Sequence, residues 1–273
     1  MNPQPSVQGA QGVAAGSVAP AAPRLPSFRL DGQRALVTGA GRGIGAACAQ
    51  ALAQAGAQVC VAARSAAEVQ AVAEGIVRQG GQAQALVLDV TDSAAVANSV
   101  QSLGALDILV NSAGTNRPAL ITDTPDHDLH AVMDLNVYAA FYLAREAARH
   151  MIHRGQGGSI ITVSSQMGHV GGPKRAVYCA TKHAVEGLTK ALAWELGPHR
   201  IRVNTLCPTF IRTAMTEPML QDPSFAEFVR SRIALGRIGT VEDVMGAVVF
   251  LASPAAALIT GTALMVDGGW TAA

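Results

Sequence analysis

Charged residues are scarce in this 273-residue sequence, and neither sign of charge dominates. Asp, Glu, Lys and Arg make up 14% of it, against roughly 25% in a typical soluble domain. The net charge is +1 and no dense run of Lys or Arg is present, which argues against a nucleic-acid-binding protein. So small a charged surface favours an oligomer, in which subunits cover part of one another.

Cysteines are few, and long hydrophobic runs are absent. The most apolar window, residues 244–259, is too short to span a membrane and is interrupted by Pro254, so we expect no membrane association. The cysteines show no metal-ligand spacing and fall within predicted helices and strands. This predicts reduced structural thiols in a cytoplasmic protein, without a disulfide or a zinc site. They are Cys48, Cys60, Cys179 and Cys207.

Residues 1–26 carry no charged side chain before Arg24 and are rich in Pro, Gly, Gln and Ala, which predicts a disordered tail. The segment has neither the basic start and apolar core of a secretory signal nor the arginines of a mitochondrial transit peptide. Nothing marks a second domain in the remainder. We therefore expect one catalytic domain over residues 27–273.

Short segments rich in Val, Ile and Leu alternate with stretches of helical periodicity. Strands that are apolar on both faces are typical of a covered parallel sheet, and the alternation is typical of βαβ units. We expect a single-domain, Rossmann-type α/β fold: a doubly wound sheet of about seven parallel strands, with ligands bound beyond their carboxyl ends. The predicted strands are 34–39, 58–62, 83–89, 107–111, 159–164, 201–208 and 263–267.

A glycine cluster lies between the first predicted strand and a helix. Its glycines permit a tight turn and let the backbone approach a pyrophosphate, which the amides at a helix N-terminus favour. The spacing Gly39-x-x-x-Gly43-x-Gly45 departs from GxGxxG, although Gly41, Gly43 and Ala46 fit GxGxxA in another register. The alternative interpretation is a glycine-rich connection without a ligand.

Two other predicted strands end in residues suited to a ligand. The segment NSAG (111–114) closes the fourth strand with small side chains that leave room for a flat molecule. Asp89 ends the third strand. Its carboxylate either accepts a hydrogen bond from an adenine amino group or caps the helix that begins near Asp92.

One helical turn separates Tyr178 from Lys182, so both side chains project from one face of a helix. Taken alone, they are most simply a half-buried aromatic residue and its solvated neighbour. The alternative is that the ammonium lowers the pKa of the phenol from about 10 towards neutrality. The phenol would then serve as a proton donor and acceptor.

Taken together, these motifs resemble those of the short-chain dehydrogenase/reductase family. The resemblance rests on TGxxxGIG (38–45), NSAG (111–114), Asn136, Ser165 and the YxxxK motif (178–182), in that order, and it covers about residues 28–273. It implies an oxidoreductase that transfers a hydride between a nicotinamide cofactor and a carbonyl or secondary alcohol.

The resemblance implies catalytic roles for four residues. Tyr178 is the general acid/base, and Lys182 lowers its pKa and holds the nicotinamide ribose. Ser165, thirteen positions before Tyr178, stabilises charge on the substrate oxygen, with Ser164 as the alternative. Asn136 steadies a helix kink and a water molecule through which Lys182 exchanges protons with solvent.

The resemblance also implies a set of cofactor-binding residues. Ala63 stands where NAD-dependent members usually carry an Asp, and Arg64 follows it. Arg64, and Arg42 in the glycine turn, are each able to pair with a 2′-phosphate, which favours NADP(H), with NAD(H) as the alternative. The implied residues are Gly39, Gly41, Arg42, Gly43, Ile44, Gly45, Arg64, Asp89, Val90, Asn111, Ala113, Gly114, Tyr178, Lys182, Pro208, Ile211 and Thr213.

A segment at about 209–238 resembles the mobile substrate lid of the family. Thr213 matches the position that contacts the nicotinamide carboxamide, whereas Thr209 replaces the usual glycine. Gln166 and His169 either bind a hydroxylated substrate or belong to an ordinary loop. The apolar lid residues, which either line a pocket or pack within the lid, are Met215, Met219, Phe225 and Phe228.

Three functions are compatible with these residues. They are a dehydrogenase of small sugars, polyols or sugar acids, a 3-ketoacyl carrier-protein reductase, and a dinucleotide-sensing regulatory protein that has lost its chemistry. Proteins of the last kind often lack the Tyr or the Lys. For the first two, the position of Arg117, Lys174 and Arg175 is informative, because a cation at the pocket mouth would meet an acidic carrier or a carboxylate.

The helix carrying Tyr178 has another face of small side chains, at Ala180, Ala184, Gly187 and Ala191, with Trp194 near its end. This face either packs on the protein's own sheet or meets a helix of a second subunit. The resemblance favours the second arrangement, in a homotetramer or homodimer.

Overall fold

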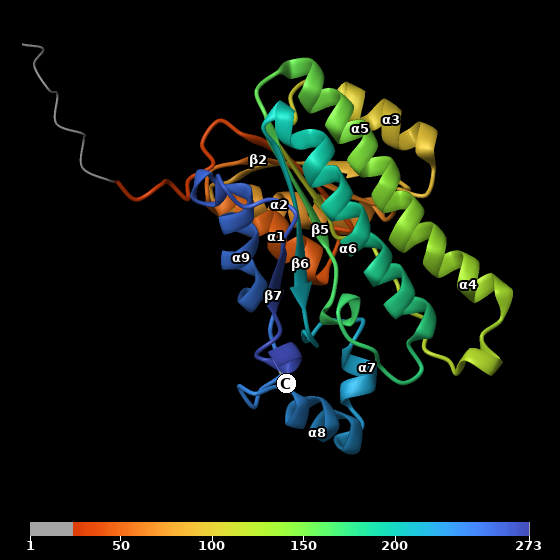
Figure 1. Cartoon of the computed structure of the whole chain (residues 1–273). Helices are drawn as coiled ribbons and strands as arrows, with labels where there is room; N and C mark the ends of the chain where they lie inside the picture. The colour runs from red at the N-terminus through yellow and green to blue at the C-terminus, as the bar shows by residue number, and fades with distance from the viewer. Residues whose placement is uncertain (1–23, 273) are drawn as a thin grey trace, which may run out of the picture.

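Within residues 24–272, which the computed structural model describes, seven parallel strands form one central sheet (Figure 1). Their order is β3-β2-β1-β4-β5-β6-β7, so the chain reverses its direction of travel between β1 and β4. This confirms the predicted doubly wound sheet and directs attention to the carboxyl ends of β1 and β4. The strands are β1 (Arg34–Thr38), β2 (Gln58–Ala63), β3 (Gln82–Val87), β4 (Ile108–Asn111), β5 (Gly158–Val163), β6 (Ile201–Pro208) and β7 (Ala263–Val266).

The predicted strand bounds agree with the structure to within two residues. The third strand differs in character. Most of the predicted strands are apolar on both faces, but the residues of β3 are exposed or half-buried, because β3 forms the edge of the sheet and has a neighbour on one side only.

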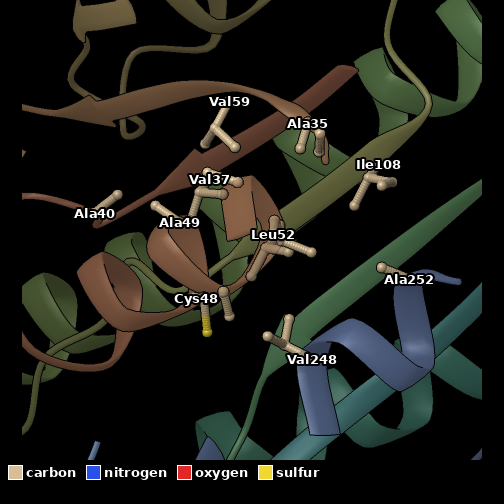
Figure 2. Packing of buried hydrophobic residues seen from close by; sticks show 14 of the residues in the cluster. Ala35, Val37, Ala40, Cys48, Ala49, Leu52, Val59, Ile108, Val248 and Ala252 are labelled. Atoms are coloured by element: carbon tan, nitrogen blue, oxygen red, sulfur yellow. The ribbon is translucent and has the colours of Figure 1, made fainter. Parts of the chain in front are cut away.

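Helices cover both faces of the sheet and enclose two hydrophobic cores. On one face, small side chains of the first helix let it pack closely on the sheet, with Leu52 filling the space towards Val248 (Figure 2). This layer contains α1 (Gly43–Gln54), α2 (Ala66–Arg78) and α9 (Glu242–Ala252). The opposite layer contains α3 (Ser93–Ser102), α5 (Ala139–Arg154) and α6 (Ala176–Leu196).

Side-chain caps fix the start of two helices beside the predicted site. The Ser65 hydroxyl accepts a hydrogen bond from the Glu68 amide at the start of α2. Asp92 accepts from the amides of Ala94 and Ala95 at the start of α3. Asp89 therefore does not cap α3, because that position belongs to Asp92.

The segment predicted as a lid contains α7 (Glu217–Leu220) and α8 (Pro223–Arg232), which form a small core of their own. Phe225 packs against this core, so its role is the packing one, whereas Met215 is 60% exposed. Lid motion stays a prediction. Most of the tail predicted for residues 1–26 lies outside the described residues.

One face of α6 points into solvent. Ala180, Ala184, Gly187 and Ala191 are exposed, and Trp194 is 87% exposed. The small-residue face therefore does not pack on the protein's own sheet. Between residues 24 and 272 no helix combines the length and the apolar character needed to cross a membrane.

Candidate active site

The glycine turn after β1 is too closely packed for larger residues at two positions. Gly39 has a φ of 63°, and a Cβ there would lie 2.7 Å from the amide nitrogen of Ala113. A Cβ on Gly45 would lie 2.2 Å from the carbonyl oxygen of Gly39. The turn thus brings the first residues of α1 directly over the ends of β1 and β4.

A cavity of about 480 Å³ opens beside this turn. Residues at the carboxyl ends of several strands line it, and sequence reasoning missed some of these residues, among them Ser65, Glu68, Leu135 and Thr216. The predicted site residues that line it are Gly39, Gly41, Arg42, Gly43, Ile44, Gly45, Arg64, Asp89, Val90, Ala113, Gly114, Ser165, Tyr178, Lys182, Pro208, Ile211 and Thr213.

Two predicted site residues are buried and do not line the cavity. Asn111 accepts a hydrogen bond from the Thr38 hydroxyl at 2.9 Å, which ties β4 to β1. Asn136 lies in a π-helical turn, Asp134–Tyr138, that joins α4 (Asp126–Met133) to α5. A helix irregularity is present where the resemblance implied a kink.

Asn136 secures the loop that follows β4. Its Oδ1 accepts from the Thr115 amide at 2.8 Å, and its Nδ2 donates to the Thr115 carbonyl at 2.9 Å and to Thr181 Oγ1 at 3.0 Å. A Cβ on Gly114 would lie 3.3 Å from Asn136 Oδ1 and 3.8 Å from Lys182 Nζ. One buried amide thereby connects this loop to α6 next to Lys182.

Ser165, Tyr178 and Lys182 converge from the end of β5 and the first turns of α6. Lys182 Nζ donates to the carbonyl oxygen of Val163 at 2.9 Å and lies 5.5 Å from the centre of the Tyr178 ring. The Ser165 hydroxyl donates to Gln166 Oε1 at 2.7 Å and accepts from the Met167 amide at 3.1 Å. Ser164 also lines the cavity.

Burial controls the protonation of these groups. Burial raises the pKa of the Tyr178 phenol above its ordinary value, while the Ser165 hydroxyl and the charge of Arg175 act in the opposite direction. Burial also lowers the pKa of Lys182 to about 8. The pKa of the phenol therefore lies above its ordinary value in this structure, because desolvation outweighs the neighbouring charges. The effect of Lys182 on that pKa stays a prediction.

The two arginines predicted to bind the 2′-phosphate of the cofactor have different surroundings. Arg42 is exposed and forms an ion pair with Glu68, with 3.3 Å between Nη1 and Oε1. Arg64 lines the cavity, and Asp89 lies near enough for the Arg64 charge to lower its carboxyl pKa. The larger cause of that lowered pKa is Thr91, whose amide and hydroxyl both donate to Asp89.

None of the three cations named as discriminators lines the cavity, and their surroundings differ. Arg117 forms an ion pair with Asp128, and Lys174 is exposed. Arg175 is only 8% exposed, and among residues 24–272 no carboxylate pairs with it. Its Nη2 lies 3.4 Å from the sulfur of Met219 in α7. Burial lowers the pKa of Arg175, and its charge acts to lower the pKa of Tyr178, one turn further along the chain.

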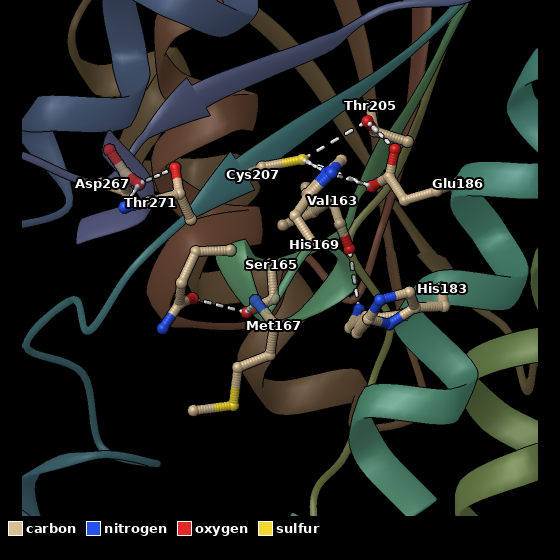
Figure 3. A network of polar contacts seen from close by, with 12 residues as sticks. Val163, Ser165, Met167, His169, His183, Glu186, Thr205, Cys207, Asp267 and Thr271 are labelled. Carbon is tan, nitrogen blue, oxygen red and sulfur yellow. Dashed lines mark hydrogen bonds and ion pairs between the residues drawn. The ribbon is translucent and has the colours of Figure 1, made fainter. Parts of the chain in front are cut away.

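Sequence reasoning missed a buried polar cluster behind Lys182. Glu186, one turn after Lys182 on α6, accepts a hydrogen bond from Thr205 at 2.9 Å and contacts Cys207 and His169 (Figure 3). No signal in the spacing of these residues indicates the cluster, because they come from a loop, a helix and a strand.

The chain is similar over most of its length to known proteins. A family model described as Enoyl-(Acyl carrier protein) reductase matches residues 39–271. Gluconate 5-dehydrogenase of Gluconobacter oxydans is 41% identical over 248 residues, which cover 89% of this chain and 96% of that protein. L-xylulose reductase of Homo sapiens is 37% identical over 243 residues, with 89% and 98% covered.

Solved structures share the fold as well. The crystal structure of a gluconate 5-dehydrogenase from Burkholderia cenocepacia, in complex with NADP and tartrate, matches with a TM-score of 0.88. The two chains are 39% identical, and the match covers 91% of this chain and 99% of that one.

Replacing Lys182 by Met should make the folded protein more stable near neutral pH. Because the folded pKa is about 8, well below the unfolded one, the folded state holds a disfavoured charge at about pH 7. We expect the free energy of unfolding to rise by about 1–3 kcal/mol at that pH. The gain should shrink above about pH 8, where the folded wild type loses the proton and the unfolded chain keeps it.

Urea unfolding of wild type and variant at about pH 7 and about pH 9.5 measures this difference. Lys190→Met, on the exposed face of the same helix, is the matched control and should change stability by no more than about 0.5 kcal/mol. A Lys182→Met variant less stable than wild type at neutral pH would contradict the account.

Proposed function

The chain belongs to the short-chain dehydrogenase/reductase family, and we propose that it interconverts a secondary alcohol and a ketone on a small polyhydroxylated acid, with NADP(H) as the preferred cofactor. It is an NAD(P)-dependent oxidoreductase that acts on CH–OH groups. The observation that carries the proposal is that Ser165, Tyr178 and Lys182 line the same cavity as the glycine turn.

The residues of this cavity fit a dinucleotide. The turn offers bare backbone where no Cβ has room, and α1 begins at Gly43 beside it, so amide donors face a pyrophosphate. The bound nicotinamide would accept or supply the hydride. Lys182 holds the adjoining ribose, and Thr213, 3.3 Å from a Cβ added at Gly43, lies at the other side of the turn.

Tyr178 transfers a proton to or from the reacting oxygen, and Ser165 stabilises the charge on that oxygen. In reduction, the Tyr178 hydroxyl gives its proton to the carbonyl oxygen, and in oxidation the phenolate takes it back. The raised pKa keeps the phenol protonated, and so ready to donate, in the free protein. The Ser165 hydroxyl turns from Gln166 to donate to the same oxygen.

The distribution of charge at the end of β2 favours NADP(H) over NAD(H). Ala63 leaves that strand end without a carboxylate that would repel a 2′-phosphate, and the adjacent Arg64 faces the cavity. Arg42 is the weaker candidate, because it already pairs with Glu68. Solved relatives are described as complexes with NADP, which agrees with this preference.

Arg175 favours an acid over a neutral sugar. Burying a guanidinium without a carboxylate is costly, so a site that retains one beside the catalytic tyrosine is suited to a substrate that brings its own negative charge. The relative named gluconate 5-dehydrogenase is named for a sugar acid, whereas the relatives named L-xylulose reductase are named for a neutral sugar.

The two other candidate functions receive less support. Arg117 at the surface is already neutralised by Asp128, so it offers little free charge to an acidic carrier protein. A purely sensing protein has no need of a tyrosine, a lysine and a serine that converge on the reaction centre.

We further propose a cytoplasmic homodimer or homotetramer. The small-residue face of α6 is exposed, and Tyr138 in the π-helical turn and Phe141 in α5 are 49% and 45% exposed. A second copy would cover these apolar side chains. The four cysteines are free thiols, which suits a reducing compartment.

Replacing Arg64 by Gln should weaken NADPH binding about tenfold or more and change NADH binding by no more than about twofold. A charge-assisted hydrogen bond to a phosphate contributes about 1.5–3 kcal/mol to binding. NADH has no 2′-phosphate, so its binding does not depend on this hydrogen bond. Fluorescence titration with the two cofactors measures both constants. Arg78→Gln, on exposed α2 away from the cavity, should leave both unchanged. Equal losses for the two cofactors would count against the phosphate contact.

Replacing Arg175 by Gln should lower kcat/KM for a polyhydroxylated acid such as gluconate about 10- to 100-fold, through the lost carboxylate pair. A neutral polyol of the same length should be affected by no more than about threefold. Steady-state rates of reduced cofactor formation measure both, with Arg117→Gln as the control. Equal losses on both substrates would show that Arg175 only shapes the site.

A further inference from the structure

Three side chains with metal-binding atoms meet behind the catalytic residues. Cys207 Sγ lies 3.4 Å from Glu186 Oε1 and 3.7 Å from His169 Nε2, and the distance from His169 Nε2 to Glu186 Oε1 is 3.5 Å (Figure 3). Glu186 and Cys207 are buried, whereas the His169 side chain is 27% exposed. The cluster therefore has one ligand at the surface and two inside.

The proposed catalysis leaves this cluster unexplained. Glu186 is a buried carboxylate, yet the nearby Lys182 directs its amine to the Val163 carbonyl instead. The adjoining Ser164 hydroxyl is buried and has no hydrogen-bond partner among the described residues. Ser164 Oγ and Glu186 Cγ each lie 3.1 Å from a Cβ added at Gly168, so the unpaired hydroxyl borders the same space.

We propose that His169, Glu186 and Cys207 form a binding site for one Zn²⁺ ion. Imidazole, carboxylate and thiolate are the three ligand types that zinc takes, at about 2.0–2.3 Å, in tetrahedral geometry. Bonds of that length place neighbouring ligand atoms about 3.3–3.7 Å apart, and the distances in the cluster have this size.

The donor set selects against other abundant cations. Mg²⁺ and Ca²⁺ take oxygen ligands and would not gain from a thiol and an imidazole. Three protein ligands leave a fourth position for water, and Ser164 Oγ offers that water a hydrogen-bond partner. Zinc binding replaces the S–H bond of Cys207 by an S–Zn bond and releases the proton to solvent.

The proposed site adjoins the reaction centre, although its three ligands are not among the catalytic residues. Glu186 follows Lys182 by one turn of α6, and Ser164 precedes Ser165 directly. The proposal does not depend on the substrate class, because it concerns residues outside the catalytic group and is read out by binding.

Calorimetric titration of the metal-free, full-length protein with ZnCl₂ tests the proposal. We expect one Zn²⁺ per chain, with proton release revealed by the difference between two buffers of unequal ionisation enthalpy. Cys207→Ser and Glu186→Gln should each weaken binding at least about tenfold. Cys179→Ser, which removes a cysteine outside the cluster, should bind as wild type does.

Co²⁺ provides a second readout that does not require a folded variant. The wild type with Co²⁺ should show thiolate-to-metal charge-transfer absorption, and Zn²⁺ should displace it. Absence of that absorption, or Zn²⁺ affinity unchanged in Glu186→Gln, would overturn the proposal and leave the cluster as a hydrogen-bonded network. The Tyr178-dependent reaction would be unaffected by that result, so the two accounts fail separately.

Discussion

The hydrogen bond from the buried Lys182 ammonium to the Val163 carbonyl is the constraint around which the site is arranged. A cation removed from water needs fixed acceptors, and the end of β5 supplies one. Holding Lys182 there sets the position of α6, and with it Tyr178 one turn earlier. Gly114 and Asn136 complete the enclosure, because a Cβ at position 114 would crowd the Asn136 amide and lie in contact with the Lys182 amine.

This arrangement costs stability and serves function. Desolvation raises the pKa of the phenol and lowers that of the lysine, so both groups are displaced towards the neutral form. The ribose hydroxyls of a bound cofactor would accept hydrogen bonds from Lys182. The reacting oxygen of a bound substrate would be the hydrogen-bond partner of Tyr178. Arg175 extends the same principle to charge, because it is buried beside the catalytic tyrosine and no carboxylate among residues 24–272 forms an ion pair with it.

The fold was predictable from sequence because its signals are local. Apolar strands, intervening helical periodicity and the glycine turn each depend on neighbours in the chain, and all seven strands were located. The solvent exposure of β3 was not predictable in the same way, since it depends on which strand ends the sheet. The YxxxK and NSAG motifs drew attention to residues that mostly line the cavity, although Asn111 does not. Whether burial or neighbouring charge dominates the pKa of Tyr178 depends on the surrounding residues, which the motifs do not indicate. The cluster of His169, Glu186 and Cys207 joins three distant segments, so cysteine spacing alone pointed away from a metal.

The central claim is that Tyr178 transfers the proton, and Tyr178→Phe tests it most directly, on whichever polyhydroxylated acid or ketose the wild type turns over fastest. The variant keeps the ring and loses only the hydroxyl. NADPH should bind with an affinity within about threefold of wild type, while kcat falls about 10²- to 10⁴-fold. Turnover that is undiminished, with cofactor binding intact, would contradict the account.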